Sequence, residues 1–144
     1  STNLKHSEPA EARKPPSTHP WRLYVFKEDN ILEVIHLWER SVWLLGRDQN
    51  LVDIITPHPS CSGQHAALQF RNTLWDHDET PRAMMEHSGT MCVGLFLVDL
   101  DSTHHTSLNG THIESNRYVK VKNKDVIRFG GSKRDYVVLL PDIS

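Results

Sequence analysis

From Trp21 onward the chain consists of short, mostly alternating apolar segments, and this pattern constrains the fold more than any other feature of the sequence. The segments are rich in β-branched and aromatic side chains, and turn-forming residues such as Asn109-Gly110 and Gly130-Gly131 separate them. They read "WRLYVFK", "ILEVIHLW", "SVWLLG", "LVDIIT", "HAALQFR", "CVGLFLVDL", "RYVKVK", "DVIRFG" and "YVVLLP". Many short strands at this spacing predict an antiparallel β-sandwich or barrel, and no segment has helical periodicity over a useful length.

Two stretches lie outside this pattern. Residues 1–20 contain four of the eight prolines and a single large aliphatic residue, Leu4. Because such a segment buries too little apolar surface to offset its ordering entropy, a flexible N-terminal arm is predicted, and its removal is expected to leave the melting temperature nearly unchanged. Residues 21–144 are predicted to form one domain, interrupted by a polar loop at 76–91.

Composition excludes several classes of protein. The formal net charge of the 144 residues is −2, whereas a general binder of nucleic acid or of anionic membranes shows a basic excess. No apolar stretch approaches the roughly 18 residues that a membrane-spanning helix needs. The two cysteines imply no disulfide framework, so a reducing, intracellular environment is expected.

The segment "HPSCSGQHAALQF" (58–70) concentrates chemically capable side chains and allows three interpretations. Ser62 and His65 could form a nucleophile and its base, but no G-x-S-x-G elbow surrounds Ser62, and the pair lacks an evident orienting carboxylate. A metal site is the second interpretation, although no paired C-x-x-C or H-x-x-x-H element is present. The side chains that could bind a metal ion are those of His58, Cys61 and His65, together with Cys92, His104 and His105 farther along the chain.

The third interpretation is a loop that holds an anion. The Ser62 hydroxyl and the backbone N–H groups around Gly63 can donate hydrogen bonds, and a guanidinium from another loop would supply charge. The segment "WLLGRDQN" (43–50) provides it, because an apolar strand ends at Gly46 and is followed by Arg47 in a polar turn.

At these residues the chain resembles the forkhead-associated (FHA) domain family. The resemblance rests on Gly46-Arg47, on Ser62-x-x-His65 and on "DLDSTHHTSLNGT" (99–111), which matches the family motif D-L-G-S-T-N-G-T-F-L-N-G without a gap. "NKDVIRFG" (123–130) resembles the family's closing strand, so the resemblance covers about residues 21–141. It implies an all-β, FHA-type β-sandwich of about eleven mostly antiparallel strands, which binds phosphothreonine peptides through the loops at one end.

The resemblance also implies a role for each matching residue. Arg47 would clamp the phosphate with its guanidinium fork, and Ser62 would donate its hydroxyl to a phosphate oxygen. Gly63 stands where many relatives carry Lys or Arg, so only its backbone N–H remains to contribute. Thr103 would contact the phosphate or the threonine methyl group. His104 stands where an asparagine usually binds the peptide main chain.

Other matching residues are expected to shape the loops. Gly46 would allow the bend from strand to loop, and His65 would brace the loop backbone as a buried imidazole. Asn109-Gly110 is a two-residue signal for a hairpin turn. His105 replaces a motif glycine that is expected to need an unusual backbone conformation.

A narrower resemblance concerns "DIITPHPSCSGQHAALQFR" and "NRYVKVKNKDVIRFGGSKRDYVVLL". Both are similar to the FHA subgroup of Smad nuclear-interacting proteins, which includes the pre-mRNA leakage subunit of the retention-and-splicing (RES) complex. The resemblance implies a nuclear, spliceosome-associated protein. Its partners would be a phosphothreonine-containing protein and splicing-complex subunits, among them one with an RNA-recognition motif. The resemblance implies a protein that is not an enzyme and that needs no cofactor or metal. Direct contact with nucleic acid or membrane is not expected. Outside the complex, the protein is expected to be a monomer.

The substitutions at Gly63, His104 and His105 leave an alternative open. They remove a cationic contact, an amide and a flexible turn residue from the family pattern, which weakens the case for phosphate binding more than the case for the fold. The alternative is an interaction scaffold with a degenerate pocket, which binds its partners without phosphate.

Overall fold

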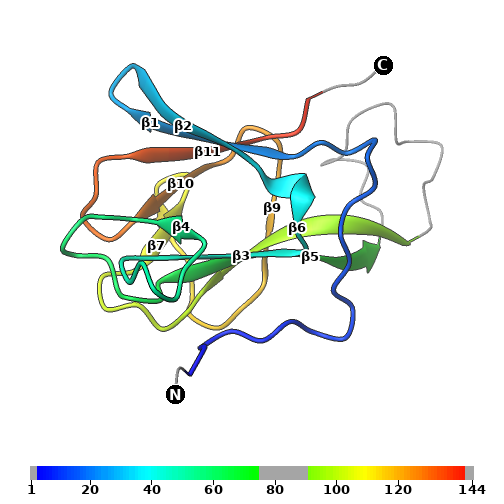
Figure 1. Cartoon of the computed structure of the whole chain (residues 1–144), viewed down its shortest axis with the longest axis horizontal. Coiled ribbons are helices and arrows are strands. Elements are labelled where there is room, and N and C mark those ends of the chain that lie inside the picture. Colours follow the sequence, from blue (N-terminus) through cyan, green and yellow to red (C-terminus); the bar gives the residue numbers. More distant parts are fainter. Residues whose placement is uncertain (1–2, 75–90, 142–144) are drawn as a thin grey trace.

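The computed structural model describes residues 3–74 and 91–141, which form eleven strands in two packed sheets (Figure 1). The strands are β1 Arg22–Lys27, β2 Asn30–His36, β3 Val42–Gly46, β4 Ile54–Ile55, β5 Ala66–Leu74, β6 Met91–Asp99, β7 Thr106–Leu108, β8 Thr111–His112, β9 Val119–Val121, β10 Val126–Phe129 and β11 Asp135–Leu139. One turn of 3₁₀ helix, Leu37–Glu39, joins β2 to β3. No helix in the described part of the chain is long and apolar enough to cross a membrane.

The two sheets are built almost entirely from antiparallel pairs. One sheet has the strand order β2-β1-β11-β10-β7-β8, and the other has the order β4-β3-β5-β6-β9. Within the described residues the parallel ladder is β3 with β4, where Leu45 pairs with Ile54. The prediction of an all-β sandwich of about eleven mostly antiparallel strands is confirmed.

The predicted polar loop at 76–91 lies outside the described residues except for its last position. Met91 is the first residue of β6, where it pairs with Leu74 of β5. The ladder of β5 and β6 runs from this pair to Ala66 and Asp99, and it is the longest in the structure. The Ala66–Asp99 pair therefore lies at the end of the sandwich where the loops meet.

The core lies between the sheets because alternate residues of each strand point inward. On β5, Leu68 and Phe70 are fully buried and pack with β6 and the opposite sheet in one large apolar cluster. Ala67 belongs to a second, smaller cluster together with Leu44 and Val98. Since Ala67 and Leu68 are neighbours in the strand, these clusters lie on opposite faces of the five-stranded sheet.

The N-terminal segment, for which the sequence predicted a flexible arm, covers part of the outer face of this sheet. Figure 1 shows the dark blue segment running along the lower side of the sheet before it rises to β1. Beyond the end of β3, the free edge of β5 is paired with the arm: Arg13 N–H donates to the Phe70 carbonyl at 3.3 Å, and Asn72 N–H donates to the Glu11 carbonyl at 2.9 Å. An edge that β3 leaves unpaired is thereby protected.

Polar contacts hold the rest of the arm. The buried Gln69 side chain accepts a hydrogen bond from His6 Nε2 at 2.9 Å through Oε1, and its amide nitrogen donates to Glu8 at 3.0 Å. Glu8 also accepts from the Ser41 hydroxyl at 2.5 Å, and these two hydrogen bonds lower the pKa of Glu8. The Lys5 amide donates to Gln64 at 2.8 Å. These contacts of the arm are hydrogen bonds, which a count of apolar burial from the sequence does not include.

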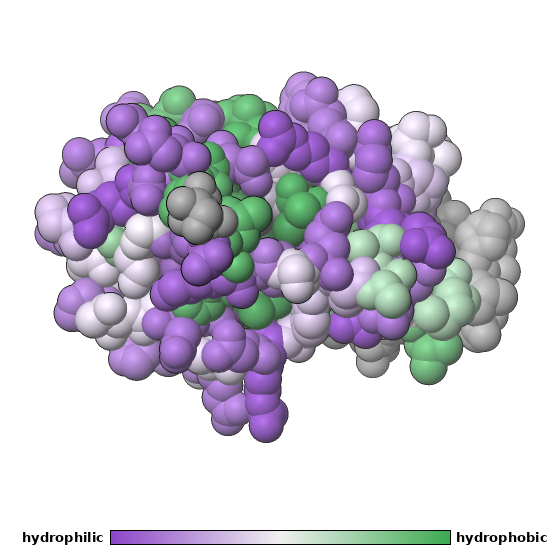
Figure 2. All heavy atoms as spheres, turned by 60° about the horizontal axis from the view of Figure 1, so that its bottom comes forward, coloured by the Kyte–Doolittle hydropathy of each residue, from purple (hydrophilic) through white to green (hydrophobic). Residues whose placement is uncertain are grey.

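The face that carries the arm is mostly hydrophilic. Figure 2, which turns the lower side of Figure 1 toward the viewer, shows purple surface with separate green areas and no broad green patch. A polar covering of this kind is consistent with hydrogen bonds as the main attachment of the arm.

Deletion of residues 1–14 is expected to destabilise the domain. It exposes the outer edge of β5 and removes the His6 and Glu8 partners of the buried Gln69 amide. A loss of about 1–2 kcal/mol corresponds to a fall of roughly 3–8 °C in melting temperature for a domain of this size. Differential scanning calorimetry measures the change, and hydrogen exchange should show faster exchange at the Asn72 amide.

Glu11→Ala is a suitable control for this deletion, because Glu11 contacts β5 through its backbone carbonyl, which the substitution keeps. Its melting temperature should equal that of the intact chain. An unchanged melting temperature after the deletion would contradict the docked arm.

Candidate functional site

Three loops meet at one end of the sandwich, at the left of Figure 1. They follow β3, β4 and β6, and backbone hydrogen bonds join the first two: Arg47 N–H donates to the Ser62 carbonyl at 3.0 Å, and Asp48 N–H donates to the Gly63 carbonyl at 3.1 Å. The third loop is joined to the second where Thr103 N–H donates to the Ser62 hydroxyl oxygen at 3.1 Å. The structure thus brings Arg47, Ser62, Gly63 and Thr103 into one cluster, here called the Arg47 cluster.

Gly46 is required by the close approach of the first two loops. A Cβ atom at Gly46 would lie 2.1 Å from the carbonyl oxygen of Gly63, far inside van der Waals contact. A Cβ atom at Gly63, in contrast, would meet the Asp48 side chain at 3.5 Å, an ordinary contact. The backbone pairing of the two loops therefore depends on glycine at position 46 and tolerates a side chain at position 63.

The Arg47 side chain is exposed but anchored at one nitrogen. Its Nε–H donates to the carbonyl of Cys61 at 2.9 Å. In the described part of the chain, no hydrogen bond or ion pair uses its two Nη groups. A guanidinium fixed at Nε presents both Nη groups as a fork, which suits the oxygens of a phosphate or carboxylate.

Ser62 follows Cys61, whose carbonyl anchors this guanidinium, and has a hydroxyl hydrogen to offer. Its oxygen accepts from Thr103 N–H, and its own backbone N–H donates to His65 Nδ1 at 3.0 Å. Since a serine hydroxyl both donates and accepts, the hydrogen remains available to an anion. Thr103 lies at the surface, so its side chain can contact the same ligand.

His65 is fully buried and joins all three loops. Nδ1 accepts from Ser62 N–H, so the hydrogen of the neutral ring is on Nε2, which donates to the His105 carbonyl at 2.9 Å. Its backbone N–H donates to the Leu45 carbonyl at 2.8 Å, and its carbonyl accepts from Leu100 N–H at 2.9 Å. Every polar group of this residue is used to hold loops together.

Burial lowers the pKa of His65 below its ordinary value of about 6.5. The hydrogen bond to the His105 carbonyl and the charge of Asp99 act in the opposite direction, whereas His104 and His105 add to the lowering. The ring is therefore neutral at pH 7, in agreement with its hydrogen bonds.

Asp99 organises the third loop and was not singled out from the sequence. Its buried carboxylate accepts hydrogen bonds from the hydroxyls of Ser102, Thr106 and Ser115 at 2.6, 2.6 and 2.7 Å. Burial alone would raise the pKa of Asp99, but these hydrogen bonds outweigh it and leave the pKa below its ordinary value. The sequence contains a pattern that could have indicated this role of Asp99: several serines and threonines at 102–115 follow a strand that ends in aspartate.

The third loop contains two non-glycine residues in the left-handed region. Asp101 has φ 60° and His105 has φ 69°, and both stand where the family motif has glycine. Such a conformation costs a side chain about 1–2 kcal/mol, which the Asp99 hydrogen bonds and the His65 contact offset. The His105 ring stacks on His112 of β8, with the ring centres 4.8 Å apart.

The remaining site residues predicted from the sequence are His104, Asn109 and Gly110. His104 is exposed, and none of the hydrogen bonds of the described residues uses its side chain. Asn109 and Gly110 form the turn between β7 and β8 with φ 52° and 86°, as the Asn-Gly pair predicts. The Asn109 side chain accepts from Val126 N–H at 2.9 Å and donates to Asp125 at 3.0 Å, so it ties the hairpin to β10.

The contacts do not support a nucleophile or a metal site. His65 has no ring nitrogen left to accept the Ser62 hydroxyl proton, because Nδ1 and Nε2 are both engaged. The buried Cys61 thiol donates to the Phe129 carbonyl at 3.7 Å, and His58 pairs with Ser60. Within residues 3–74 and 91–141, no group of three His, Cys, Asp or Glu side chains is placed to hold a metal ion.

The FHA domain family model matches residues 43–130, which is more than half of the chain. The chain therefore belongs to the FHA domain family, whose members are modules of the phosphopeptide-binding type. The match spans the three loops of the Arg47 cluster, and the sandwich is the FHA-type fold that the motifs predicted.

Individual proteins are similar to the chain over most of its length. Smad nuclear-interacting protein 1 of Mus musculus is 44% identical over 138 residues, which cover 94% of this chain and 33% of that protein. The chain thus spans about a third of that relative's length. The structure of Pml1, a yeast splicing factor integrated into the RES complex, matches with a TM-score of 0.76 at 21% identity, over 97% of this chain and 99% of that one. The MEK1 FHA domain in complex with a phosphothreonine peptide of HOP1 matches with a TM-score of 0.61 at 19% identity, over 86% of this chain and 99% of that one.

Gly46→Ala is expected to destabilise the domain by about 1–3 kcal/mol, because the added methyl group collides with the Gly63 carbonyl and forces the paired loops apart. Gly63→Ala is the matched control, since its methyl group meets only an ordinary contact. Thermal unfolding of both variants measures the difference. Equal stability of the two would contradict the close approach of the loops.

His65→Ala is expected to cost about 2–4 kcal/mol at pH 7.5, because it leaves the Ser62 amide and the His105 carbonyl unpaired and opens a cavity. Its effect depends on pH. Because folding lowers the pKa of His65, the intact domain is fully stabilised above pH 6.5 and loses stability as the pH falls below that value.

Chemical denaturation between pH 7.5 and 5.5 checks this prediction. The stability of the intact domain should decline over that range, and His65→Ala should reduce the decline. His36→Ala, which removes an exposed imidazole, should keep it. The Asp99 contribution is distinguishable, since a lowered carboxyl pKa affects stability only near pH 4 and below. An identical pH dependence in His65→Ala and the intact domain would contradict a buried neutral imidazole.

Proposed function

We propose that this chain is the phosphothreonine-peptide-binding module of a subunit of a nuclear pre-mRNA splicing or retention complex. The observation that carries the proposal is the Arg47 guanidinium, which is anchored through Nε to the Cys61 carbonyl and has both Nη groups without a partner among the described residues, while the backbone of Arg47 pairs with Ser62. A fork of donors next to a free hydroxyl fits the oxygens of a phosphate dianion.

Arg47, Ser62 and Thr103 act on the phosphate, and the Gly63 amide adds a backbone donor. His104 takes the position from which the peptide main chain is bound, with one imidazole hydrogen bond in place of the two that an amide makes. Gly46, His65, Asn109 and Gly110 hold the loops in place. None of these residues has a catalytic role, and the binding needs no cofactor or metal.

The proposed nuclear location and membership of a splicing complex rest on similarity to the relatives. Similarity to Smad nuclear-interacting protein 1 supports a nuclear location, and similarity to Pml1 supports membership of a complex of the RES type. The partners would then be a phosphothreonine-containing protein and splicing-complex subunits, including one with an RNA-recognition motif. The similarity to the MEK1 domain with its bound peptide supports phosphothreonine as the ligand.

A second candidate function is an interaction scaffold that works without phosphate. It is favoured by Gly63, which offers no cation, and by the exposed imidazole of His104. In that case partners would bind through the outer faces of the sheets, and the Arg47 cluster would have no ligand.

Arg47→Ala is expected to weaken phosphothreonine-peptide binding by roughly 10- to 100-fold. A charge-assisted hydrogen bond to phosphate is worth about 1.5–3 kcal/mol, and each 1.4 kcal/mol is about tenfold in affinity. The melting temperature should change little, because the side chain is exposed. Thr103→Ala should cost about 1 kcal/mol, as expected for a neutral hydroxyl. Isothermal titration calorimetry checks both, with the best binder from a phosphothreonine peptide library and its unphosphorylated form.

Arg13→Ala is the control of equal charge, since Arg13 contacts β5 through its backbone. Gly63→Arg separates the two candidate functions: position 63 has room for a side chain, and the added cation should tighten phosphopeptide binding by roughly tenfold. If Arg47→Ala binds the phosphopeptide as well as the unaltered chain does, or if no phosphopeptide binds, the scaffold replaces the phosphate site.

A further inference from the structure

Among the described residues, β2 is the longest strand at an edge of either sheet. The edge strands are β2 and β8 in one sheet and β4 and β9 in the other. β2 has seven residues, whereas β4, β8 and β9 have two or three. In the described part of the chain β2 pairs with β1 alone, and Figure 1 shows the β1–β2 hairpin at the upper border of the molecule. The other side of β2 therefore presents a row of unpaired N–H and C=O groups, to which a further strand can add.

Apolar side chains accompany this free edge. Three of them belong to β2 and are exposed: Ile31 at 55%, Leu32 at 46% and Val34 at 43%. Val34 lies opposite Tyr24 of β1, and Tyr24 lies opposite Val137 of β11. Residues opposite each other in a ladder point to the same face, and neither Tyr24 nor Val137 is buried. An apolar row thus crosses the outer face of the six-stranded sheet and ends at β2.

Glu33 points to the other face of β2. It lies opposite Val25, which is buried in the large core cluster, but Glu33 itself is exposed. Arg22 of β1 points to the outer face, because it is three residues from Val25 in the strand. A charged residue on the core side of an edge strand disfavours pairing with an arbitrary strand. A strand that adds to β2 must therefore bring a group that neutralises Glu33.

The segment that contains β2 is acidic. Between residues 28 and 39 there is no Lys or Arg, and four acidic residues are exposed: Glu28, Asp29, Glu33 and Glu39. Within residues 3–74 and 91–141, no ion pair uses any of them. Unpaired acidic side chains along one edge attract a basic segment and disfavour an acidic one.

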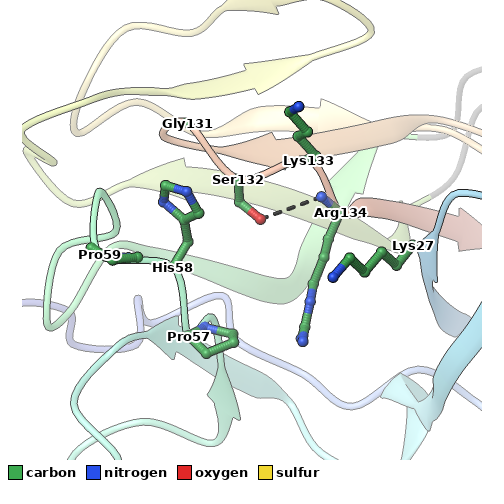
Figure 3. Close-up of a pocket in the computed structure, with 8 residues that line it drawn as sticks. All are labelled: Lys27, Pro57, His58, Pro59, Gly131, Ser132, Lys133 and Arg134. Carbon is green, nitrogen blue, oxygen red and sulfur yellow. Dashed lines mark hydrogen bonds between the residues drawn. The ribbon is translucent and has the colours of Figure 1, made fainter.

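The cations that flank this segment in the sequence are directed elsewhere. Lys27 ends β1, and Figure 3 shows its side chain extending beside that of Arg134 into the cavity between the neighbouring loops. Arg40 is paired with Asp53 at 2.6 Å. The charge of Glu33 is therefore left for a partner to neutralise.

A second copy of the chain is a poor occupant of this edge. Glu33 is the central residue of β2, which spans Asn30–His36. When two β2 strands overlap completely in an antiparallel pair, each Glu33 lies opposite the other, and like charges in this position destabilise the pair. A shift of register that separates the two carboxylates shortens the ladder.

We propose that β2 binds, as an added strand, an extended segment of a partner protein in which β-branched apolar residues alternate with Lys or Arg. The backbone of this segment pairs with the free N–H and C=O groups of β2, which supplies affinity. Its cations face Glu33, and its apolar side chains extend the row that ends at Val34. This surface shares no residue with the Arg47 cluster and needs no phosphate, so it provides a binding activity beyond the proposed function.

The test uses synthetic peptides of about nine residues in which valine and threonine alternate with lysine, and a matched set with glutamate in place of lysine. Amide hydrogen exchange of the intact chain is followed by NMR. The lysine peptide should slow exchange at the amides of residues 31–35 that are not paired with β1, and the glutamate peptide should not. A lysine peptide that is N-methylated at consecutive residues cannot donate along either edge, and it should not protect β2.

Glu33→Lys should weaken binding of the lysine peptide about 3- to 30-fold and should allow the glutamate peptide to bind. Glu11→Lys is the matched control, because it makes the same change of charge on the arm, where Glu11 contacts β5 through its backbone. It should leave the affinity for both peptides unchanged. Since Glu33 and Glu11 are exposed, both variants should keep the melting temperature of the intact chain.

Three outcomes overturn the inference. The lysine peptide fails to protect β2, the N-methylated peptide binds as well as the unmodified one, or Glu33→Lys keeps the preference for lysine over glutamate. Analytical ultracentrifugation without peptide tests the remaining occupant and should show a monomer. A dimer in which the β2 amides are already protected would mean that a second copy fills this edge, and the proposed partner would be wrong.

Parallel titrations separate this surface from the phosphate site. Arg47→Ala should bind the lysine peptide as tightly as the intact chain does. Glu33→Lys should keep the affinity for the phosphothreonine peptide at physiological salt, where distant exposed charges are screened. If the intact chain binds only one of the two peptides, only the proposal that concerns the other peptide has failed.

Discussion

His65 is held at four points, and each of them belongs to a different part of the loop end. Its ring accepts from Ser62 N–H and donates to the His105 carbonyl, while its backbone pairs with Leu45 and Leu100. Because the ring is fully buried and neutral, no water can replace a lost contact without opening the core. The relative positions of Arg47, Ser62 and Thr103 depend on this one imidazole, although it touches no ligand.

Other features of the loop end follow from this constraint. The first two loops can approach closely only because residue 46 has no side chain. The third loop reaches the His65 ring through His105, which adopts a left-handed conformation that the Asp99 hydrogen bonds stabilise. Strain, close packing and buried polar bonds thus coincide where the sandwich presents its loops, as is common at binding sites.

The loop between β4 and β5 is joined to two other loops. Its Cys61 carbonyl accepts from the Arg47 guanidinium, and its Ser60 hydroxyl oxygen accepts from Gly131 N–H of the loop between β10 and β11. The net charge of −2 for the chain does not describe this end, where the two Nη groups of Arg47 have no hydrogen-bond or ion-pair partner among the described residues. The proposed phosphate site is therefore formed by side chains from loops far apart in the sequence, and the net charge of the chain does not predict it.

The sequence by itself determined the all-β class, the character of most strands and the hairpin turn at Asn109-Gly110, because alternation and turn chemistry are local properties. The number of about eleven strands was implied by the family resemblance, since the alternating pattern marked nine segments and missed the short strands β7 and β8. It also identified Gly46, Arg47, Ser62 and His65 as residues that belong together, through motif order. Only the tertiary structure decided that residues 6–13 lie against β5 and that Asp99 organises the third loop. These features depend on polar groups that meet across long sequence separations, and neither periodicity nor composition records which side chains the packing of two sheets brings together.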